Sequence, residues 1–500
     1  MAWLYTPPVW QVDTPMSSLA NLLKISAIYT TTSGITGLLT MGTFFMLARS
    51  LTAAELGYIE LFISMVPLLA ALAESGILSA LSYYYYASED ETARRRYVSV
   101  AHIFQTAASV LIILALLLLK DVVCRFLELP PDAGVYLFFF LLIFALEIQF
   151  GFCRDLFRLR IEYKRSAAMM ILRNLVIFSA VLYFYLVVGE FNVRNYFLVL
   201  CCGILLPVIL MFGKTGLIPS EGFDTTVFRR MFKYGRPLLF SAAAIYFINY
   251  ADRLIIQKLS TTTELGYYAV AFKVAAISGL AIQGFQSAWA PIMLKSTLRE
   301  GDLDLPKKSI AHYLFITLVI FFCVSCLAHE IIWILAGKMY LRSSGIVVFL
   351  VMSIIAFGAY DILHSGIVLG KRLIFHAICM ITAGAVNLAL NILFVTWWGI
   401  KGAALATALS SILSVAMAYF FSQRISPLPF PGRKILAALI VVSISGIVLY
   451  QCALAPFVTR VALLLLGLIL TGLLFPTEAS AFRNHIREKF NSFANGFTNQ

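Results

Sequence analysis

The sequence predicts an all-α integral membrane protein built from two parallel-oriented six-helix repeats and a C-terminal helix pair. Hydrophobic residues make up 61% of the chain and charged residues 13%, with a mean hydropathy of +0.89, so most of it cannot present a water-soluble surface. Apolar stretches of ~20 residues, the length that a helix needs to cross a bilayer, recur from end to end. A long segment of the chain also repeats at a fixed offset, which indicates a duplication.

The apolar stretches define about fourteen membrane-spanning helices, each suited to a hydrocarbon core ~30 Å thick. In chain order they are expected at 25–48, 57–82, 98–119, 134–153, 166–188, 195–213, 235–257, 267–291, 310–335, 344–369, 373–395, 400–422, 434–452 and 457–475. The ends of such stretches are located to within ~2–4 residues.

The duplication relates residues 24–63 to residues 233–272, because Lys24 matches Lys233 at an offset of 209 positions. The motif Glu-Leu-Gly-Tyr at 55–58 recurs at 264–267 at the same offset. An offset that is kept through a helix, a loop and the next helix start is typical of an internal repeat. Transporters with such repeats bind their substrate where the two halves meet.

Four parts follow from the repeat. Residues 1–213 form an N-lobe of helices 1 to 6, and residues 214–234 form a basic cytoplasmic linker. Residues 235–425 form a C-lobe of helices 7 to 12, and residues 426–500 form the C-terminal helix pair and a cytoplasmic tail. Since six is even, the lobes share one orientation and are related by an axis near the membrane normal.

The distribution of cations predicts that both termini are cytoplasmic. Of the 38 Lys and Arg residues, 26 fall on the N-terminal side of the expected helices, nine on the opposite side and three inside helices. Cytoplasmic loops carry the excess of Lys and Arg in membrane proteins. The net charge of +13 is therefore a topology signal, strengthened by attraction to anionic lipids, and nucleic acid is not an expected partner.

No metal or other cofactor is expected. Cys323, Cys326, His329 and Glu330 lie close together in the sequence but lack the paired ligand spacing of a structural zinc site. Thiols inside apolar helices behave as small hydrophobic groups. The sequence contains no Walker motif, so ATP is not expected to drive transport directly.

Several short motifs resemble those of bacterial polysaccharide transport proteins. They are Tyr-Gly-Arg-Pro at 234–237, Asp-Arg-Leu-Ile-Ile at 252–256, Glu-Leu-Gly-Tyr-Tyr at 264–268, and the run from Asn387 to Asn391 followed by 399–407. The family comprises the Wzx-like flippases of O-antigen and exopolysaccharide. It belongs to the superfamily of the MATE drug exporters and the lipid II flippase. The resemblance covers nearly the whole chain.

The resemblance implies two six-helix lobes that form a V around a central cavity opening alternately to either side of the bacterial inner membrane. It implies a substrate that is an undecaprenyl-diphosphate-linked oligosaccharide, moved from the cytoplasmic to the periplasmic leaflet for lipopolysaccharide or exopolysaccharide biosynthesis. The implied partners are this lipid-linked oligosaccharide, membrane lipids, and a polysaccharide polymerase and other assembly proteins.

Seven ionisable residues lie well inside expected helices: Glu74, Glu147, Arg173, Asp252, Arg253, Lys273 and Asp361. Each would cost about 2.5–3.5 kcal/mol facing lipid, so all are expected to face the interior. Arg173, Lys273 and Arg253 are candidates for binding the diphosphate, because an ion pair at 4 Å is worth about 4 kcal/mol at an effective dielectric near 20. Asp252 and Arg253 are also expected to form a structural pair.

Glu74, Glu147 and Asp361 are candidates for coupling transport to H⁺ or Na⁺, since ionisable residues inside membrane bundles mark ion pathways. His364 and His376 are alternatives. The competing interpretation for each is a buried pair or a helix contact that only fixes the packing.

Polar and aromatic residues inside helices are candidates for contacting the sugars: Gln283, Gln286, Trp289, Asn387 and Asn391. A hydrogen bond between helices is an equally good interpretation of each. No catalytic residue is expected.

A flippase is the first interpretation, and two alternatives remain. A MATE-like exporter of small cationic molecules shares the scaffold. A cationic substrate favours an acidic cavity, however, and the basic residues expected inside three helices argue against it. An integral membrane polysaccharide polymerase or ligase would be an enzyme with sizeable extracytoplasmic loops, whereas the longest outward loop expected here, 120–133, is short.

Overall fold

The computed structural model describes residues 19–129, 133–189, 191–215, 222–295, 304–370, 372, 374–481 and 483–484. All regular structure in these residues is helical. The helices are α1 (Leu19–Ser50), α2 (Ala53–Glu74), α3 (Ile77–Ala87), α4 (Glu91–Leu118), α5 (Lys120–Phe126), α6 (Ala133–Leu159), α7 (Tyr163–Tyr183), the π-helix η1 (Phe184–Val188), α8 (Val193–Thr215), α9 (Thr225–Leu259), α10 (Thr262–Lys295), α11 (Asp304–Cys326), α12 (Ala328–Leu335), the 3₁₀ helix η3 (Lys338–Ser343), α13 (Ser344–Leu363), α14 (Ser365–Leu369), α15 (Ile374–Trp398), α16 (Ile400–Ile425), α17 (Gly432–Gln451) and α18 (Phe457–Leu474).

The ends of the repeated helices agree with the offset read from the sequence. Helix α1 ends at Ser50 and α9 at Leu259, and α2 begins at Ala53 and α10 at Thr262, so both pairs of ends are 209 positions apart. The cause is local. Thr52 and Glu55 form a capping box at the start of α2, and the equivalent Thr261 hydroxyl accepts the Glu264 N–H at 3.1 Å.

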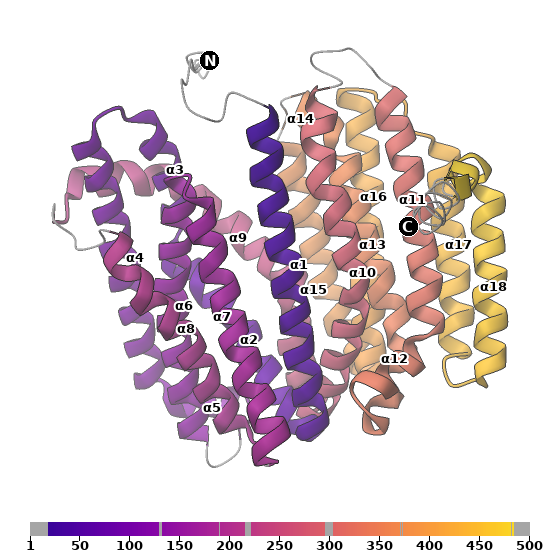
Figure 1. The fold of residues 1–500 in the computed structure, drawn as a ribbon, viewed down its shortest axis with the longest axis horizontal. Coiled ribbons are helices and arrows are strands. Elements are labelled where there is room, and N and C mark those ends of the chain that lie inside the picture. The colour runs from indigo at the N-terminus through magenta and orange to yellow at the C-terminus, as the bar shows by residue number, and fades with distance from the viewer. Residues whose placement is uncertain are drawn as a thin grey trace, which may run out of the picture.

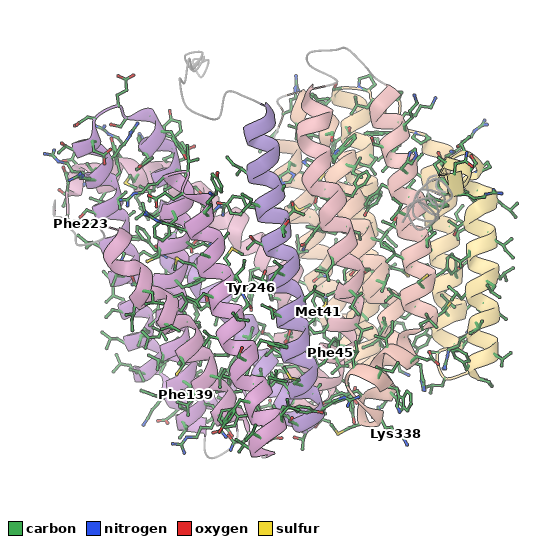
Figure 2. The ribbon with its side chains drawn as sticks, viewed as in Figure 1. Met41, Phe45, Phe139, Phe223, Tyr246 and Lys338 are labelled. Carbon is green, nitrogen blue, oxygen red and sulfur yellow. The ribbon has the colours of Figure 1, made fainter. Side chains whose placement is uncertain are left out.

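The helices form two groups that lie side by side (Figure 1). Helix α1 stands between the groups and packs against α7 on one side and α10 on the other. In the C-terminal group, α13 packs against α10 and α16, and α15 packs against α9 and α16. Tyr246 of α9, and Met41 and Phe45 of α1, lie in the middle of the molecule between the groups (Figure 2).

The two groups meet closely where α2 and α10 cross. A Cβ atom on Gly57 would lie 2.0 Å from the Thr262 carbonyl oxygen, and one on Gly266 would lie 1.9 Å from the Ala53 carbonyl oxygen. The contact is reciprocal, because Gly57 and Gly266 are equivalent in the repeat, as are Ala53 and Thr262. Only glycine allows the two backbones to approach this closely.

Side chains hold the same end together. The Arg49 guanidinium of α1 donates to the Leu335 carbonyl of α12 at 3.1 Å, and the Lys258 amine of α9 donates to Glu128 at 3.1 Å. We call this end, where α5 and α12 lie at the bottom of Figure 1, the closed end. A path between the lobes cannot open here without breaking these contacts.

Within the described residues, twelve helices are long and apolar enough to cross a membrane. Each coincides with one of the predicted spans. The two remaining predicted spans, 235–257 and 267–291, fall on α9 and α10, which are 35 and 34 residues long. The chain is a multi-pass membrane protein, and a total of fourteen spans stays a prediction.

Several predicted elements differ in detail. Ser75 and Gly76 adopt positive φ angles of 44° and 75°, so the helix expected at 57–82 is divided into α2 and α3. The spans expected at 310–335 and 344–369 are each interrupted as well, after Cys326 and Leu363. Helix α9 begins at Thr225, so the last part of the expected linker is helical. The apolar pattern continues through each of these breaks, and the pattern alone does not reveal them.

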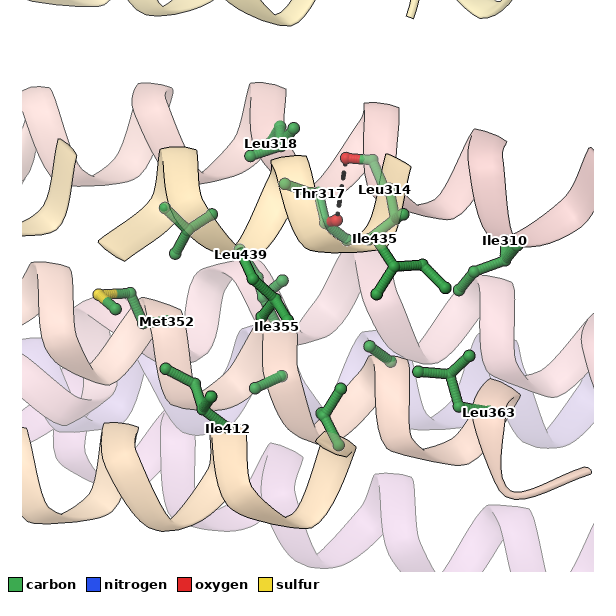
Figure 3. A pocket seen from close by; sticks show the side chains of 15 residues that line it. Ile310, Leu314, Thr317, Leu318, Met352, Ile355, Leu363, Ile412, Ile435 and Leu439 are labelled. Carbon is green, nitrogen blue, oxygen red and sulfur yellow. Dashed lines mark hydrogen bonds between the residues drawn. The ribbon is translucent and has the colours of Figure 1, made fainter. Parts of the chain in front are cut away.

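The C-terminal pair α17 and α18 packs on the outer side of α11 and α13. A small cavity of ≈ 40 Å³ lies between α11, α13, α16 and α17 and is lined almost entirely by aliphatic side chains (Figure 3). The one hydroxyl among them, on Thr317, donates to the Tyr313 carbonyl at 2.8 Å. This cavity therefore offers no free polar group to a sugar.

Candidate functional site

A buried ionic cluster joins the two lobes near the closed end. Asp252 and Arg253 are neighbours on α9, and only 3% and 2% of their side chains are exposed. The Arg253 guanidinium lies 2.7 Å from the Asp252 carboxylate and 3.2 Å from the carboxylate of Glu60 on α2. The expected neighbour pair is thus within hydrogen-bonding distance, and a carboxylate of the other lobe completes it.

Aromatic groups enclose the cluster. The Tyr268 hydroxyl donates to the second Asp252 oxygen at 2.5 Å, and the ring centroid of Phe272 lies 4.4 Å from the guanidinium carbon of Arg253. Charges held in such a site depend on one another, because each lacks the solvation that water would supply. Removing Arg253 would leave both carboxylates without the guanidinium that they share.

Lys273 lies beside this cluster and is only partly buried. Its amine is 5.3 Å from the ring centroid of Phe44 on α1 and near enough to Glu60 to interact electrostatically. The structure gives Lys273 no ion pair or hydrogen bond with another described residue. Among the three predicted diphosphate ligands, Lys273 is therefore the one whose charge is attracted by a carboxylate but makes no direct ion pair with a described residue.

Arg173 and Glu147, predicted for different roles, pair with each other. The Arg173 guanidinium on α7 donates to both oxygens of Glu147 on α6, one of them at 3.0 Å. The two side chains keep 25% and 22% of their surface exposed. Arg173 can therefore contact a ligand only while it shares its charge with Glu147 or after that pair separates.

Asp361 of α13, a predicted coupling residue, accepts a hydrogen bond from Gln286 of α10 at 2.5 Å. The neighbouring Tyr360 hydroxyl lies 2.8 Å from the His376 ring nitrogen, and His364 stacks on the Tyr360 ring. The predicted coupling carboxylate and both histidines thus gather at one place in the C-lobe.

A polar cavity of ≈ 190 Å³ lies inside the C-lobe. Its polar lining comes from α9, α10, α13 and α16: Asn249, Asp252, Gln283, Gln286, Ser353, Thr407 and Ser411. The cavity thus brings together three residues that the sequence predicts for the site, namely Asp252, Gln283 and Gln286.

Asn387 and Asn391 do not line this cavity and are buried. Asn387 donates to the Ser410 hydroxyl at 2.9 Å, and Asn391 donates to the Asn387 carbonyl at 2.9 Å. Asn387 thus links α15 to α16, whereas the bonds of Asn391 stay within α15 and its side-chain oxygen has no partner among the described residues. Trp289 is also buried, and its indole N–H has no partner among the described residues.

Glu74, the third predicted coupling carboxylate, ends α2 at the turn formed by Ser75 and Gly76. It lies near enough to Asp155 and Arg154 of α6 to interact electrostatically with both. It therefore belongs to the N-lobe and lies apart from the ionic cluster at the closed end.

Sequence reasoning missed three residues of this region. Glu60 lies only three positions after Gly57, too near the expected helix start to be counted as an intramembrane charge. Tyr268 belongs to the motif at 264–268, and the motif does not predict its bond to Asp252. Tyr246 is 3% exposed, and its hydroxyl has no hydrogen-bond partner among the described residues. No sequence pattern distinguishes it from the other tyrosines.

A duplicated helical bundle that is closed at one end, with buried charges where its lobes meet, has the architecture of a membrane transporter. The family model described as polysaccharide biosynthesis protein matches residues 22–297, more than half of the chain. The chain belongs to this family.

The sequence is 25% identical over 202 residues to the probable low-salt glycan biosynthesis flippase Agl15 of Haloferax volcanii. That alignment covers 40% of this chain and spans 43% of the relative's length.

The fold is similar to that of the lipid II flippase MurJ in an inward closed conformation, with a TM-score of 0.72, 13% identity and coverage of 92% of this chain and 100% of that one. It is also similar to an inward-facing multidrug resistance MATE family transporter of the MOP superfamily, with a TM-score of 0.63, 13% identity and coverage of 79% and 95%. These likenesses confirm the predicted fold class, and the proteins named here are flippases and transporters.

Proposed function

We propose that this protein is a flippase that moves an undecaprenyl-diphosphate-linked oligosaccharide between the leaflets of the bacterial inner membrane by alternating access. The observation that carries the proposal is the position of the Lys273 amine. It places an available, partly buried cation where the lobes meet, in a chain of the polysaccharide biosynthesis family. We further propose that the lobes are residues 1–213 and 235–425, joined by residues 214–234, and that residues 426–500 are an added pair and tail.

The chemistry of such a substrate explains why a protein is needed. Each sugar hydroxyl that loses its hydrogen bonds in hydrocarbon costs several kcal/mol, so an oligosaccharide does not cross a bilayer unaided. The diphosphate adds negative charge, which an available ammonium stabilises strongly in a site of reduced dielectric. Lys273 is the proposed main contact of the diphosphate, on the side of the closed end, and Arg173 is a second contact that competes with Glu147.

The remaining candidates take different roles in this proposal. Gln283 and Gln286 face the polar cavity and are proposed to contact sugars. Arg253 is held by two carboxylates and acts as a positioning residue rather than a ligand. Asn387 and Asn391 maintain the helix packing. A polysaccharide polymerase and other assembly proteins are the proposed partners that receive the translocated oligosaccharide.

Replacing Lys273 by Gln is expected to abolish function without loss of protein, because Glu60 keeps its bond to Arg253. We expect surface polysaccharide in a flippase-deficient strain to fall by about tenfold or more, since the lost ion pair exceeds the 1.4 kcal/mol that corresponds to tenfold. Lys273→Arg should retain part of the activity because it keeps the charge. The control is Lys338→Gln, which removes an exposed cation on η3. Full complementation by Lys273→Gln at normal protein level would remove the lysine from the mechanism.

We propose that both termini are cytoplasmic, so that the closed end faces the periplasm, on the basis of the 26 and nine cations on the two sides. In a chain whose eight native cysteines are replaced, a cysteine at Thr263, an exposed residue of the closed end, should react with an impermeant thiol reagent in intact cells. Cysteines at Glu89 and Gly222, exposed at the other end, should react only after permeabilisation. The reverse pattern would invert the proposed transport direction.

We propose that Asp361 couples transport to H⁺ or Na⁺, with Glu147 and Glu74 as further candidates. Its support is the arrangement of Asp361 with Gln286 and two histidines at the edge of the polar cavity. In proteoliposomes, an imposed H⁺ or Na⁺ gradient should accelerate flipping by the wild type and have no effect on Asp361→Asn. If the gradient accelerates both proteins equally, Asp361 has no part in coupling.

A further inference from the structure

A second, larger cavity of ≈ 540 Å³ lies at the closed end of the C-lobe, apart from the polar cavity and the ionic cluster. It is formed where α9, α15 and α17 end and α10, α13 and α16 begin. The residues that matter for its chemistry are Glu264, Arg342, Trp398, Lys401, Tyr450 and Gln451. None of them has a role in the proposed translocation.

The charged side chains that line this cavity carry a net charge of +1. Arg342 pairs with Glu264 at 3.2 Å, but 71% of the arginine side chain is exposed, so the pair is weak and readily exchanged. The Lys401 amine lies 5.7 Å from the ring centroid of Tyr450 and has no carboxylate partner among the described residues. An anionic ligand would therefore meet one available ammonium and one guanidinium that can change partner.

The backbone adds to the positive potential. Helix α16 begins at Ile400, directly in the cavity, and its N-cap residue Gly399 has a φ of 59° and provides no side-chain cap. The first N–H groups of this 26-residue helix lack an intrahelical acceptor, and the helix dipole places partial positive charge there. Helix starts of this kind favour phosphate groups.

The position of the cavity suits a lipid. Trp397 and Trp398 end α15 with 63% and 51% of their surface exposed. Exposed tryptophans at the end of a membrane helix sit at the level of the lipid headgroups. The mouth of the cavity is therefore at the depth where the phosphates of one leaflet lie.

We propose that this cavity is a binding site for the phosphate group of a lipid, held by Lys401, Arg342 and the start of α16. Positive potential from three sources favours an anion over a neutral sugar. Two lipids carry the required group, an anionic phospholipid of that leaflet and a polyprenyl diphosphate that has been translocated. Lys401 belongs to the motif at 399–407 that signals the family, and the translocation proposal leaves it without a function.

The test measures binding to the purified full chain by native mass spectrometry, with phosphatidylglycerol, phosphatidylcholine and farnesyl diphosphate as separate probes. Lys401→Gln and Arg342→Gln should each weaken binding of the preferred anionic probe by about tenfold, the effect expected when one charge-assisted contact is lost. Glu264→Gln should tighten binding by about threefold or more, because it removes a repulsive carboxylate and releases Arg342. Lys338→Gln is the control, since Lys338 is an exposed cation outside this cavity.

Preference for phosphatidylglycerol would identify a phospholipid, and preference for farnesyl diphosphate would identify the prenyl diphosphate as the source of the phosphate. The site is disproved if Lys401→Gln, Arg342→Gln and Lys338→Gln bind all three probes as the wild type does. Because the readout is binding and not flipping, failure here would leave the proposed function untouched.

Discussion

Replacing Arg253 by Gln is expected to destabilise the protein by about 3–5 kcal/mol, the usual cost of removing one partner from a buried ion pair. The reason is that Asp252 and Glu60 would both lose the guanidinium that they share, and only the more distant Lys273 amine would offset two buried carboxylates. The midpoint of thermal unfolding in detergent and the amount of protein in membranes should both fall. Neutralising all three residues together should recover much of the stability, because no buried charge then remains unpaired.

Arg158→Gln is the matched control for this change. Arg158 also pairs with a carboxylate, that of Asp155 at 3.4 Å, but 60% of its side chain is exposed. Exposed pairs contribute about 0–1 kcal/mol, so stability should hardly change. If Arg253→Gln were as mild as Arg158→Gln, the cluster would not be the junction between the lobes that the structure indicates.

Replacing Gly57 or Gly266 by Ala is expected to prevent the closed end from forming. The added methyl carbon would lie about 2 Å from a backbone carbonyl oxygen of the opposite helix, far inside contact distance. Overpacking of this kind costs about 1–3 kcal/mol, which moves the equilibrium away from the closed state by about fivefold to about 150-fold. Flipping should fall, because alternating access requires each end to close in turn.

A cysteine at Leu56 reports this change directly. Leu56 is 0% exposed at the crossing, so the cysteine should resist an impermeant thiol reagent in the wild-type background and react in the Gly266→Ala background. Gly151→Ala is the control, because a methyl group on Gly151 in α6 meets nothing within 4 Å. Equal protection of Leu56→Cys in all three backgrounds would show that the crossing tolerates the methyl group.

The repeat explains why so much of the fold follows from the sequence. Glu-Leu-Gly-Tyr at 55–58 and 264–267 begins two equivalent helices, and its glycines allow those helices to cross. Composition and helix length then predict the spans, since a bilayer permits few alternatives. The sequence does not predict the helix breaks at Ser75 and after Leu363, because the apolar pattern continues through both.

The site was less predictable because its contacts join distant helices. Asp252 and Arg253 are consecutive, so their pairing follows from proximity. The bond from Arg253 to Glu60 depends on how α9 packs against α2, which local periodicity does not encode. Asn387 and Asn391 are a further example, because a spacing of four residues suits a ligand site and a helix junction equally well. The sequence does not predict that Asn387 bonds to Ser410 of α16.

The most direct test of the central claim measures flipping in proteoliposomes that contain only the purified protein and a fluorescent undecaprenyl-diphosphate-linked oligosaccharide. The wild type should expose the oligosaccharide to an external reagent at a rate that rises with protein content. Lys273→Gln should reduce that rate to the level of protein-free vesicles, and Lys273→Arg should give an intermediate rate. A wild-type rate no higher than that of empty vesicles would contradict the proposed flippase activity, and an unchanged rate for Lys273→Gln would contradict the proposed role of Lys273.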